Sequence, residues 1–263
     1  MKILVCVKQV PDTSGKVAVN PDGTLDRASM QTITNPDDLN AVEAALVLKE
    51  QTGAEVVVVC MGPPPAEGML RECLARGCDR AVLVSGREFG GSDTYATSQI
   101  LAAAINRIGV EKEDIIMCGR QAIDGDTAQV GPEIAEHLDY PQVTYALEAE
   151  EAEGGLKVKK EVEGGQEIIG IQSPCVVTFT KPAWDPRYPT IKRKMAANRA
   201  EIPTLTAADL PAIDLTQAGL KGSPTKVKKT FVPQKKTGGV KFQGEVEETA
   251  KQLFAALSDA GVL

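Results

Sequence analysis

The sequence predicts an α/β protein whose core is a doubly wound parallel sheet. Three observations support this fold class. Short apolar runs alternate with helical patterns up to about residue 140, then comes a stretch with period-two alternation and paired glycines, and a segment rich in Pro, Gly and Lys comes last. The first pattern is typical of parallel strands joined by helices, the second of an antiparallel excursion, and the third of an extended C-terminal arm.

Four apolar runs predict the parallel strands. Each is nearly continuous in apolar residues, as expected for strands that helices cover on both faces. The runs span residues 3–7, 56–60, 81–84 and 115–118.

Helices are expected between these strands. The clearest begins at Asn35, which suits the N-cap, with Pro36 at the first helical position, and Gly53 ends it. Asp37 and Asp38 complement the positive end of this helix. Further helical patterns span residues 66–76, 92–107 and 128–138. Such units imply right-handed crossovers, and ligands then bind beyond the carboxyl ends of the strands.

The second half of the chain changes character. Alternating runs separated by glycine pairs predict an antiparallel meander within residues 143–172, and a buried strand returns at 174–178. Prolines exclude regular structure from 181–189. No helical period is evident from there to residue 243, and a short amphipathic helix is expected at 246–257. We therefore divide the chain into an α/β domain, a projecting loop and an arm, at residues 1–180, 181–200 and 201–263.

Charge is unevenly distributed along the chain. Residues 181–241 hold 13 Lys and Arg against 4 Asp and Glu, or +9, and the rest holds 16 against 32, or −16, which sum to the net −7. An acidic body repels a phosphate backbone and the basic part has few aromatics, so we expect docking onto a protein rather than nucleic-acid binding. No apolar run approaches a membrane span or a signal sequence, which favours a cytoplasmic protein without membrane attachment.

Cysteine and histidine give no sign of a metal centre or a nucleophilic catalyst. Cys6, Cys60, Cys118 and Cys175 lie in or at the end of apolar runs, where a free thiol behaves as a small buried hydrophobe. Cys73 and Cys78 have no C-x-x-C spacing. His137 is the single histidine, so a histidine-based triad is improbable.

The loop after the fourth strand is the most informative segment of the chain. Its glycines let a ligand approach the backbone, and the helix that follows offers unpaired N–H groups and a positive dipole end. Thr127 and Gln129 add neutral donors, and Arg120 adds a cation. The loop matches neither G-x-G-x-x-G nor the P-loop. We nevertheless interpret it as a cradle for the phosphates of a nucleotide.

Two carboxylates in this loop need another explanation, because they would repel a diphosphate. Asp126 and Gln129 have the spacing of a capping box. Asp124 is a candidate to accept hydrogen bonds from ribose hydroxyls.

Several turns should meet at one edge of the predicted sheet. The candidate ligand-binding residues there are Cys6, Val7, Lys8, Asn35, Asp38, Met61, Gly62, Gly119, Arg120, Gln121, Asp124, Gly125, Asp126, Thr127, Ala128, Gln129, Val130 and Gly131. A second glycine-rich loop, 85–93, resembles the phosphate loop of ATP pyrophosphatases only poorly, because it follows the third strand and Ser92 is explained as a helix N-cap.

The segment 158–178 resembles the signature of electron transfer flavoprotein β subunits. It carries basic Lys160, acidic Glu163, a glycine pair, Glu167 and Pro174 at the expected spacing. The opening 5–12, the start of the helix at Asn35, the loop 119–131 and the segment 187–191 also fall in the family's order. The resemblance covers essentially the whole chain and implies a Rossmann-like fold of the adenine nucleotide α-hydrolase type.

The resemblance implies a heterodimer with an α subunit, around which the arm 201–263 would wrap. It places the nucleotide at the same edge of the sheet. It also implies that the projecting loop recognises an acyl-CoA dehydrogenase, with Ile191 as an aliphatic anchor; packing of Ile191 onto its own domain is the alternative. Arg187, Tyr188, Lys192, Arg193 and Lys194 complete the predicted partner-binding set, and its basic members would steer the encounter.

Members of this family differ in the nucleotide held by the β subunit. Electron-bifurcating members hold FAD that takes hydride from NADH, with one electron passing to ferredoxin or flavodoxin and the other through FAD on the α subunit to the dehydrogenase. Others hold structural AMP. The residues around Gly125 and Thr127 resemble the bifurcating version, since the mitochondrial type has Asp in place of Gly125 and Cys-Asn in place of Thr127-Ala128.

We therefore expect FAD, with AMP as the alternative. An ATP-hydrolysing enzyme or nucleotide sensor of similar fold is a third possibility. No residue is expected to act as a covalent catalyst, because redox chemistry belongs to the flavin and would appear only in the complex.

Overall fold

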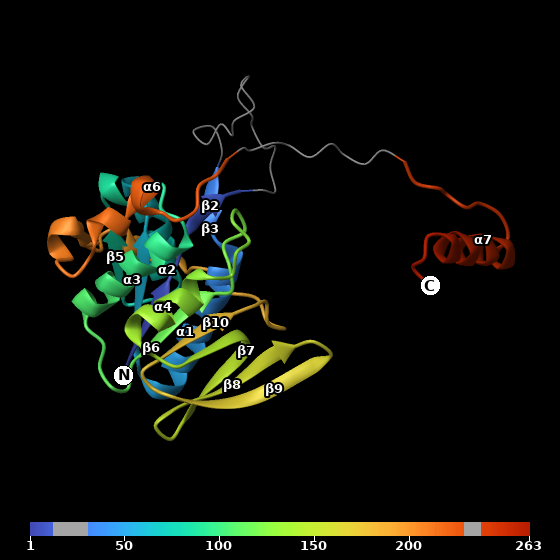
Figure 1. The fold of residues 1–263 in the computed structure, drawn as a ribbon. Coiled ribbons are helices and arrows are strands. Elements are labelled where there is room, and N and C mark those ends of the chain that lie inside the picture. The colour runs from blue at the N-terminus through green and yellow to red at the C-terminus, as the bar shows by residue number, and fades with distance from the viewer. Residues whose placement is uncertain (13–30, 229–237) are drawn as a thin grey trace.

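A computed structural model describes residues 1–12, 31–228 and 238–263. Within these residues a nine-stranded sheet runs through the molecule in the order β11-β5-β4-β1-β6-β10-β7-β8-β9 (Figure 1). Two short strands, β2 and β3, pair separately. The strands are β1 Lys2–Cys6, β2 Gln9–Pro11, β3 Thr32–Thr34, β4 Glu55–Met61, β5 Arg80–Val84, β6 Ile115–Gly119, β7 Gln142–Ala152, β8 Gly155–Val162, β9 Gly165–Gln172, β10 Cys175–Phe179 and β11 Thr204–Leu205.

The parallel part of the sheet has the doubly wound order that the sequence predicts. From β1 the chain builds outward through β4 and β5, then returns to the other side of β1 to place β6 and β10. The order of the strands therefore reverses between β1 and β6, which pair in parallel from Ile3 opposite Ile115 to Cys6 opposite Cys118. Ligands of open α/β sheets bind at such a reversal, beyond the carboxyl ends of the strands.

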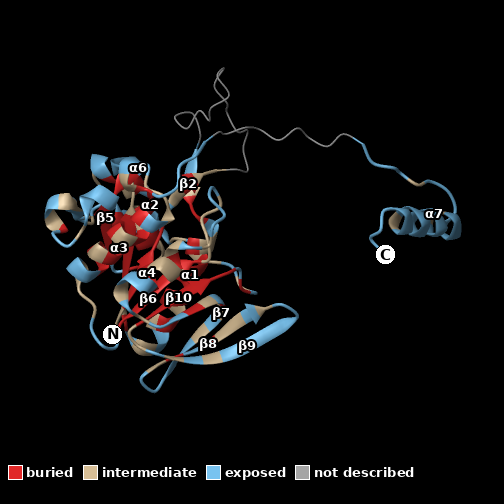
Figure 2. Ribbon diagram, in the orientation of Figure 1, coloured by how far each residue is buried: buried red, intermediate tan, exposed pale blue. Residues whose placement is uncertain are grey.

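Helices cover both faces of this parallel part. Successive residues of β1 point to opposite faces, so Ile3 and Val5 join one buried cluster with α1 and α2, and Leu4 and Cys6 join the other with α3 and α4. Figure 2 shows the buried residues concentrated in these layers. The helices are α1 Pro36–Thr52, α2 Glu67–Arg76, α3 Thr94–Ile108, α4 Val130–Leu138, α5 Ile191–Ala197, α6 Gly219–Gly222 and α7 Val246–Asp259, with 3-10 turns η1 Pro64–Ala66, η2 Arg87–Phe89, η3 Ala207–Asp209 and η4 Leu215–Gln217.

The predicted meander is present as β7, β8 and β9. Both hairpins are antiparallel, and Gly154 and Gly164 supply the left-handed backbone that their tight turns need, with φ of 74° and 81°. The outer strand β9 is largely exposed (Figure 2). The meander thus extends the sheet beyond its helical cover.

The prediction of irregular structure up to residue 243 is wrong for its first half. Helix α5 follows the proline-rich loop, β11 pairs in parallel with β5, and Leu210 and Ala218 are buried in the cluster of α3 and α4. These elements are too short to give a periodic pattern, and isolated apolar residues anchor them. Residues 204–223 therefore pack on the chain's own domain.

The glycine-rich loop 85–93 holds this returning segment in place. Asp93, and not Ser92 as predicted, caps α3 by accepting from Ala96 N, and its other oxygen accepts from Thr225 N and Oγ1 at 2.8 Å each. Ser92 Oγ instead donates to Phe89 O and accepts from Gly219 N. The side chains of this loop hold another segment of the chain by hydrogen bonds, which removes support for its likeness to a pyrophosphatase loop.

The terminal helix predicted at 246–257 is confirmed as α7, and none of its residues is buried. Residues 229–237 of the predicted arm lie outside the described part of the chain. In the described ranges no helix combines the length and apolarity needed to cross a bilayer. All six cysteines are free and buried.

Truncation of Leu210 tests whether the returning segment belongs to the domain. Leu210 is 1% exposed, so Leu210→Ala should lower the free energy of unfolding by about 2–4 kcal/mol through lost contacts and a cavity. Leu215 is 49% exposed, and Leu215→Ala should cost under about 1 kcal/mol. Urea titrations of both variants measure the difference, and equal midpoints would contradict the packing.

Candidate functional site

The carboxylate of Asp38 joins the two strand ends at which the order of the sheet reverses. Its Oδ2 accepts from Lys8 N at 2.7 Å, just after β1, and its Oδ1 accepts from Gly119 N at 3.1 Å, the last residue of β6. Asp38 lies in the first turn of α1, so one side chain ties a helix start to two parallel strands. This junction forms the floor of the predicted ligand crevice.

Gly119 is required by the close approach of α1 to this junction. A Cβ at this position would overlap the Asp38 carboxylate and the backbone of Asp37. Asp38 is only 6% exposed, and burial raises the pKa of its carboxyl from 3.8 to about 7, although the Asn35 side chain and the two backbone N–H groups act in the opposite direction.

Asn35 lies at the predicted N-cap position but its side chain does not cap α1. It reaches across to the loop after β6, where Nδ2 donates to Gln121 O at 2.8 Å and Oδ1 accepts from Ile123 N at 3.1 Å. The prediction placed this residue correctly and assigned its hydrogen bonds wrongly. Asn35 is fully buried and fixes the path of the loop against the start of α1.

The two acidic residues of the loop have partners within the chain. Lys8 Nζ donates to both oxygens of Asp124, at 2.7 and 2.9 Å, and Gln121 Nε2 donates to Asp126 Oδ1 at 2.8 Å. The capping box predicted for Asp126 and Gln129 is wrong, because Gln129 itself occupies the N-cap position of α4 and Asp126 lies in a turn with φ of 52°.

Helix α4 begins at the end of this loop without a side-chain cap. Its first N–H groups have no partner inside the helix, and its dipole puts positive potential at the loop. Gly125 and Thr127 are exposed beside it, and a Cβ on Gly125 would meet no atom within 4 Å. Gly131 is buried and packs against Thr178 of β10. The backbone donors and the open loop suit the phosphates of an anionic ligand.

Arg120 directly follows β6. Its backbone N–H donates to Phe179 O at 2.7 Å, and its Nε lies 3.2 Å from Asp37 Oδ2 in an ion pair without an aligned hydrogen bond. Burial raises the pKa of Asp37, and the Arg120 charge lowers it. Arg120 also borders a hollow whose other walls come from the meander, at Tyr145, Glu161, Val162 and Glu163.

The structure brings most of the predicted ligand residues together near the ends of β1 and β6, but they differ in which part of each residue faces the predicted site. Cys6 and Val7 have side chains buried in opposite clusters, so their backbone alone reaches the crevice. Met61 ends the neighbouring strand β4, and Gly62 follows it and donates its N–H to Val84 O at 3.0 Å. Sequence reasoning did not connect Tyr145 and Glu161 with Arg120. Nothing in their local pattern indicates that the meander, which pairs with β10, borders a hollow together with Arg120.

The predicted partner-binding residues lie on the segment 187–197, here called the docking segment, and divide into two groups. Tyr188 and Ile191 are 88% and 83% exposed, and Lys192 and Lys194 are exposed beside them. Arg187 instead pairs with Glu43 and Glu50 of α1, and Arg193 Nη1 donates to Arg76 O at 3.0 Å. Packing of Ile191 onto its own domain is therefore not observed.

The sheet, whose strand order reverses between β1 and β6, defines a doubly wound α/β protein, a fold class in which ligands bind at such a reversal. A family model for the electron transfer flavoprotein domain matches residues 22–210. The chain is 53% identical to the acryloyl-CoA reductase electron transfer subunit gamma of Anaerotignum propionicum, with 100% of both chains covered. It is 47% identical to the electron transfer flavoprotein subunit beta of Clostridium acetobutylicum, with 98% of both covered.

A further relative is the caffeyl-CoA reductase-Etf complex subunit CarD of Acetobacterium woodii, 46% identical with 100% of both chains covered. The chain belongs to the electron transfer flavoprotein family, among its β subunits. The family that the segment 158–178 suggested is thus confirmed.

Substitution of Gly119 tests the close approach at the crevice floor. Gly119→Ala should cost about 3 kcal/mol or more, because the added Cβ displaces the Asp38 carboxylate and the start of α1. Gly125→Ala is the matched control in the same loop, and open space around it predicts a change within about 0.5 kcal/mol. Denaturant midpoints of the two variants should differ accordingly, and a neutral Gly119→Ala would refute the contact.

The raised pKa of Asp38 predicts a pH dependence of stability. The folded chain holds a proton on Asp38 that the unfolded chain releases above about pH 4, so the contribution is complete at low pH and is lost as the pH rises through about 7. In Asp38→Asn this titration is absent. The free energy of unfolding of the wild type minus that of the variant should fall by about 3 kcal/mol from pH 5 to 8. A constant difference would contradict the assignment.

Proposed function

We propose that this chain is the β subunit of a heterodimeric electron transfer flavoprotein that binds FAD in the crevice between β1 and β6. With its α subunit it divides the electrons of NADH between ferredoxin or flavodoxin and an acyl-CoA dehydrogenase. The observation that carries the proposal is the uncapped start of α4 beneath the open loop around Gly125 and Thr127. An anionic dinucleotide finds there both backbone donors and room.

The chain's own residues would hold the ligand in defined ways. The N–H groups at the start of α4 would bind the phosphates, and the Thr127 hydroxyl would add a donor. Lys8 and Asp124 neutralise each other at the rim, with Lys8 Nζ 2.7 Å from Asp124 Oδ1, so a ribose hydroxyl that displaced Lys8 would find a ready acceptor. Bound FAD would supply the hydride and one-electron chemistry, which no side chain here provides.

Arg120 is the candidate for tuning such a ligand. Its side chain is 32% exposed, and its one charged contact in the described chain is the ion pair with Asp37. A cation at this position would favour the reduced, anionic form of a flavin or pair with a diphosphate. The names of the relatives support acyl-CoA chemistry, because two of them denote subunits that serve acryloyl-CoA and caffeyl-CoA reductases.

Structural AMP in the same crevice is the second candidate. The same helix start and loop would hold a single phosphate, and the chain would then serve the α subunit without taking electrons from NADH. An ATP-hydrolysing enzyme or nucleotide sensor is the third candidate, and the involvement of loop 85–93 in holding residues 219–225 leaves it with little support.

Cofactor counting separates these candidates. The chain is purified with its α subunit, the bound nucleotides are extracted and quantified, and NADH is then added without oxygen. FAD on both subunits, no AMP, and bleaching of the flavin absorbance are expected. FAD on the α subunit alone, with stoichiometric AMP and no bleaching, would refute the proposal. Hydrolysis of Mg-ATP would point to the third candidate.

A loop variant links this result to the crevice. Gly125→Asp adds a carboxylate beside the proposed phosphate site and should lower FAD occupancy of the β subunit by about tenfold, through like-charge repulsion. Gly125→Asn adds a side chain of nearly the same size without charge and should retain the cofactor, because the space around Gly125 is open. Equal FAD content in the two variants would separate the ligand from this loop.

A further inference from the structure

The first residue of the docking segment is fastened to the middle of α1. Arg187 Nε donates to both oxygens of Glu43 at 2.9 Å, its backbone N–H donates to Glu43 Oε2 at 2.8 Å, and its Nη1 donates to Glu50 Oε1 at 2.5 Å. Glu43 and Glu50 are two turns apart, so both face the same side of α1. One guanidinium therefore spans two turns of the helix.

This contact differs from an ordinary surface ion pair. Glu43 is 7% exposed, and a buried carboxylate is stable only with a partner that satisfies its oxygens. The planar guanidinium and the backbone N–H of the same residue provide these donors together. The hydrogen bond from Arg187, together with its charge, lowers the pKa of Glu50.

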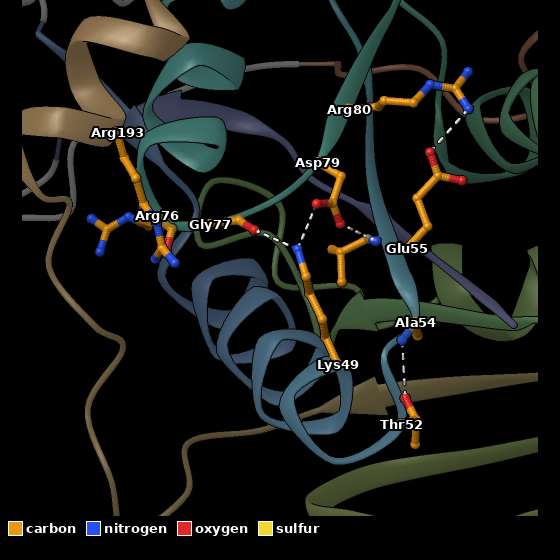
Figure 3. A network of polar contacts seen from close by, with 10 residues as sticks. Lys49, Thr52, Ala54, Glu55, Arg76, Gly77, Asp79, Arg80 and Arg193 are labelled. Carbon is orange, nitrogen blue, oxygen red and sulfur yellow. Dashed lines mark hydrogen bonds and ion pairs between the residues drawn. The ribbon is translucent and has the colours of Figure 1, made fainter.

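Helix α2 holds the same segment from the other side. Arg76 donates to the carbonyl of Arg187, and Arg193 donates back to the carbonyl of Arg76. Arg71 Nη1 donates to Ala197 O at 2.5 Å and to Ala200 O at 3.1 Å. In addition, Lys49 of α1 donates to Gly77 O, directly after α2, and to Asp79, directly before β5, which ties α1 to the turn that follows α2 (Figure 3).

The side chains that this backbone carries point away from the domain. Tyr188, Ile191 and Met195 are 88%, 83% and 57% exposed. Thr190 caps α5 by accepting from Arg193 N, and Ile191 and Met195 lie one turn apart on that helix. Apolar side chains on a backbone fixed in advance lose less freedom on binding, which raises affinity.

We infer that Arg187 is a positioning residue: through Glu43 and Glu50 it holds the docking segment in the shape in which Tyr188, Ile191 and Met195 bind the partner dehydrogenase. This inference rests on the proposed function, in which the docking segment binds an acyl-CoA dehydrogenase. Arg187 itself contributes orientation and no contact with the partner. Of the basic residues on the segment, Lys192 and Lys194 are then left to attract the partner.

Two measurements on the complex with the α subunit test the inference. The first is amide hydrogen exchange of residues 188–197, which needs no partner enzyme. The second is steady-state reduction of a purified short-chain acyl-CoA dehydrogenase, with the flavoprotein as the varied substrate. Arg187→Ala should speed exchange and raise KM by about tenfold, with kcat and flavin content unchanged. Arg187→Lys should change exchange and KM less than Arg187→Ala does, because lysine keeps the positive charge but loses the bidentate contact.

Matched variants make the outcome decisive. Glu50→Gln removes the more exposed partner and should give a smaller effect of the same kind, in a variant that retains the Glu43 contact. Arg80→Ala breaks the exposed Arg80–Glu55 pair elsewhere (Figure 3) and should change neither measurement. Ile191→Ala should raise KM without altering exchange.

Each alternative result contradicts a different statement. Unchanged exchange in Arg187→Ala would overturn the inference whatever the KM. Faster exchange with normal KM, while Ile191→Ala raises KM, would show that the held shape is irrelevant to binding and would also overturn it. Normal KM in both variants would refute the docking role in the proposed function itself.

Discussion

The buried carboxylate of Asp38 is the contact on which the rest of the crevice depends. In a doubly wound sheet the two strands at the reversal are placed by different crossovers, and their ends diverge into separate loops. Asp38 accepts one backbone N–H from each of these ends and belongs to the helix between them. Asn35, one turn earlier, adds two hydrogen bonds to the loop after β6. Together they define the opening that a ligand would enter.

Two of the acidic residues around this junction are paired with cations. Asp37 lies against Arg120, and Asp124 lies against Lys8. Asp38 has no cationic side chain within ion-pair distance in the described structure. Only the neutral Asn35 side chain and two backbone N–H groups oppose the effect of burial, which is why burial dominates its pKa. Asp126, which accepts from the neutral Gln121 amide, and Glu133 in the first turn of α4 have no cationic partner in the described structure.

Much of the fold could be predicted from the sequence, because continuous apolar runs and glycine-separated alternation are local signals. The strands near Ile3 and Ile116 and the hairpin turn at Gly154 are examples. Side-chain partners could not be predicted in the same way. Asn35 and Gln121 are 86 residues apart, and an Asn before Pro gives the same local signal whether it caps a helix or bonds a distant loop. The short elements after residue 190 could not be predicted for a related reason, since isolated apolar residues such as Leu210 form no periodic pattern.

The role of Arg187 could not be predicted from the sequence either, because a basic residue in a basic segment gives the same local signal whether it faces solvent or a buried glutamate. Its position has a consequence for α1 as a whole. Asp38 holds the start of this helix at the strand ends, and Arg187 holds the helix at Glu43 and Glu50. The number of residues between these contacts, and the side of α1 on which each contact lies, are therefore fixed. Asp38 and Glu50 are twelve residues apart, or about 18 Å along the axis. Inserting one residue between them would rotate Glu50 by about 100° around the helix axis relative to Asp38. Evolution can therefore vary the exposed side chains of α1 but not its length.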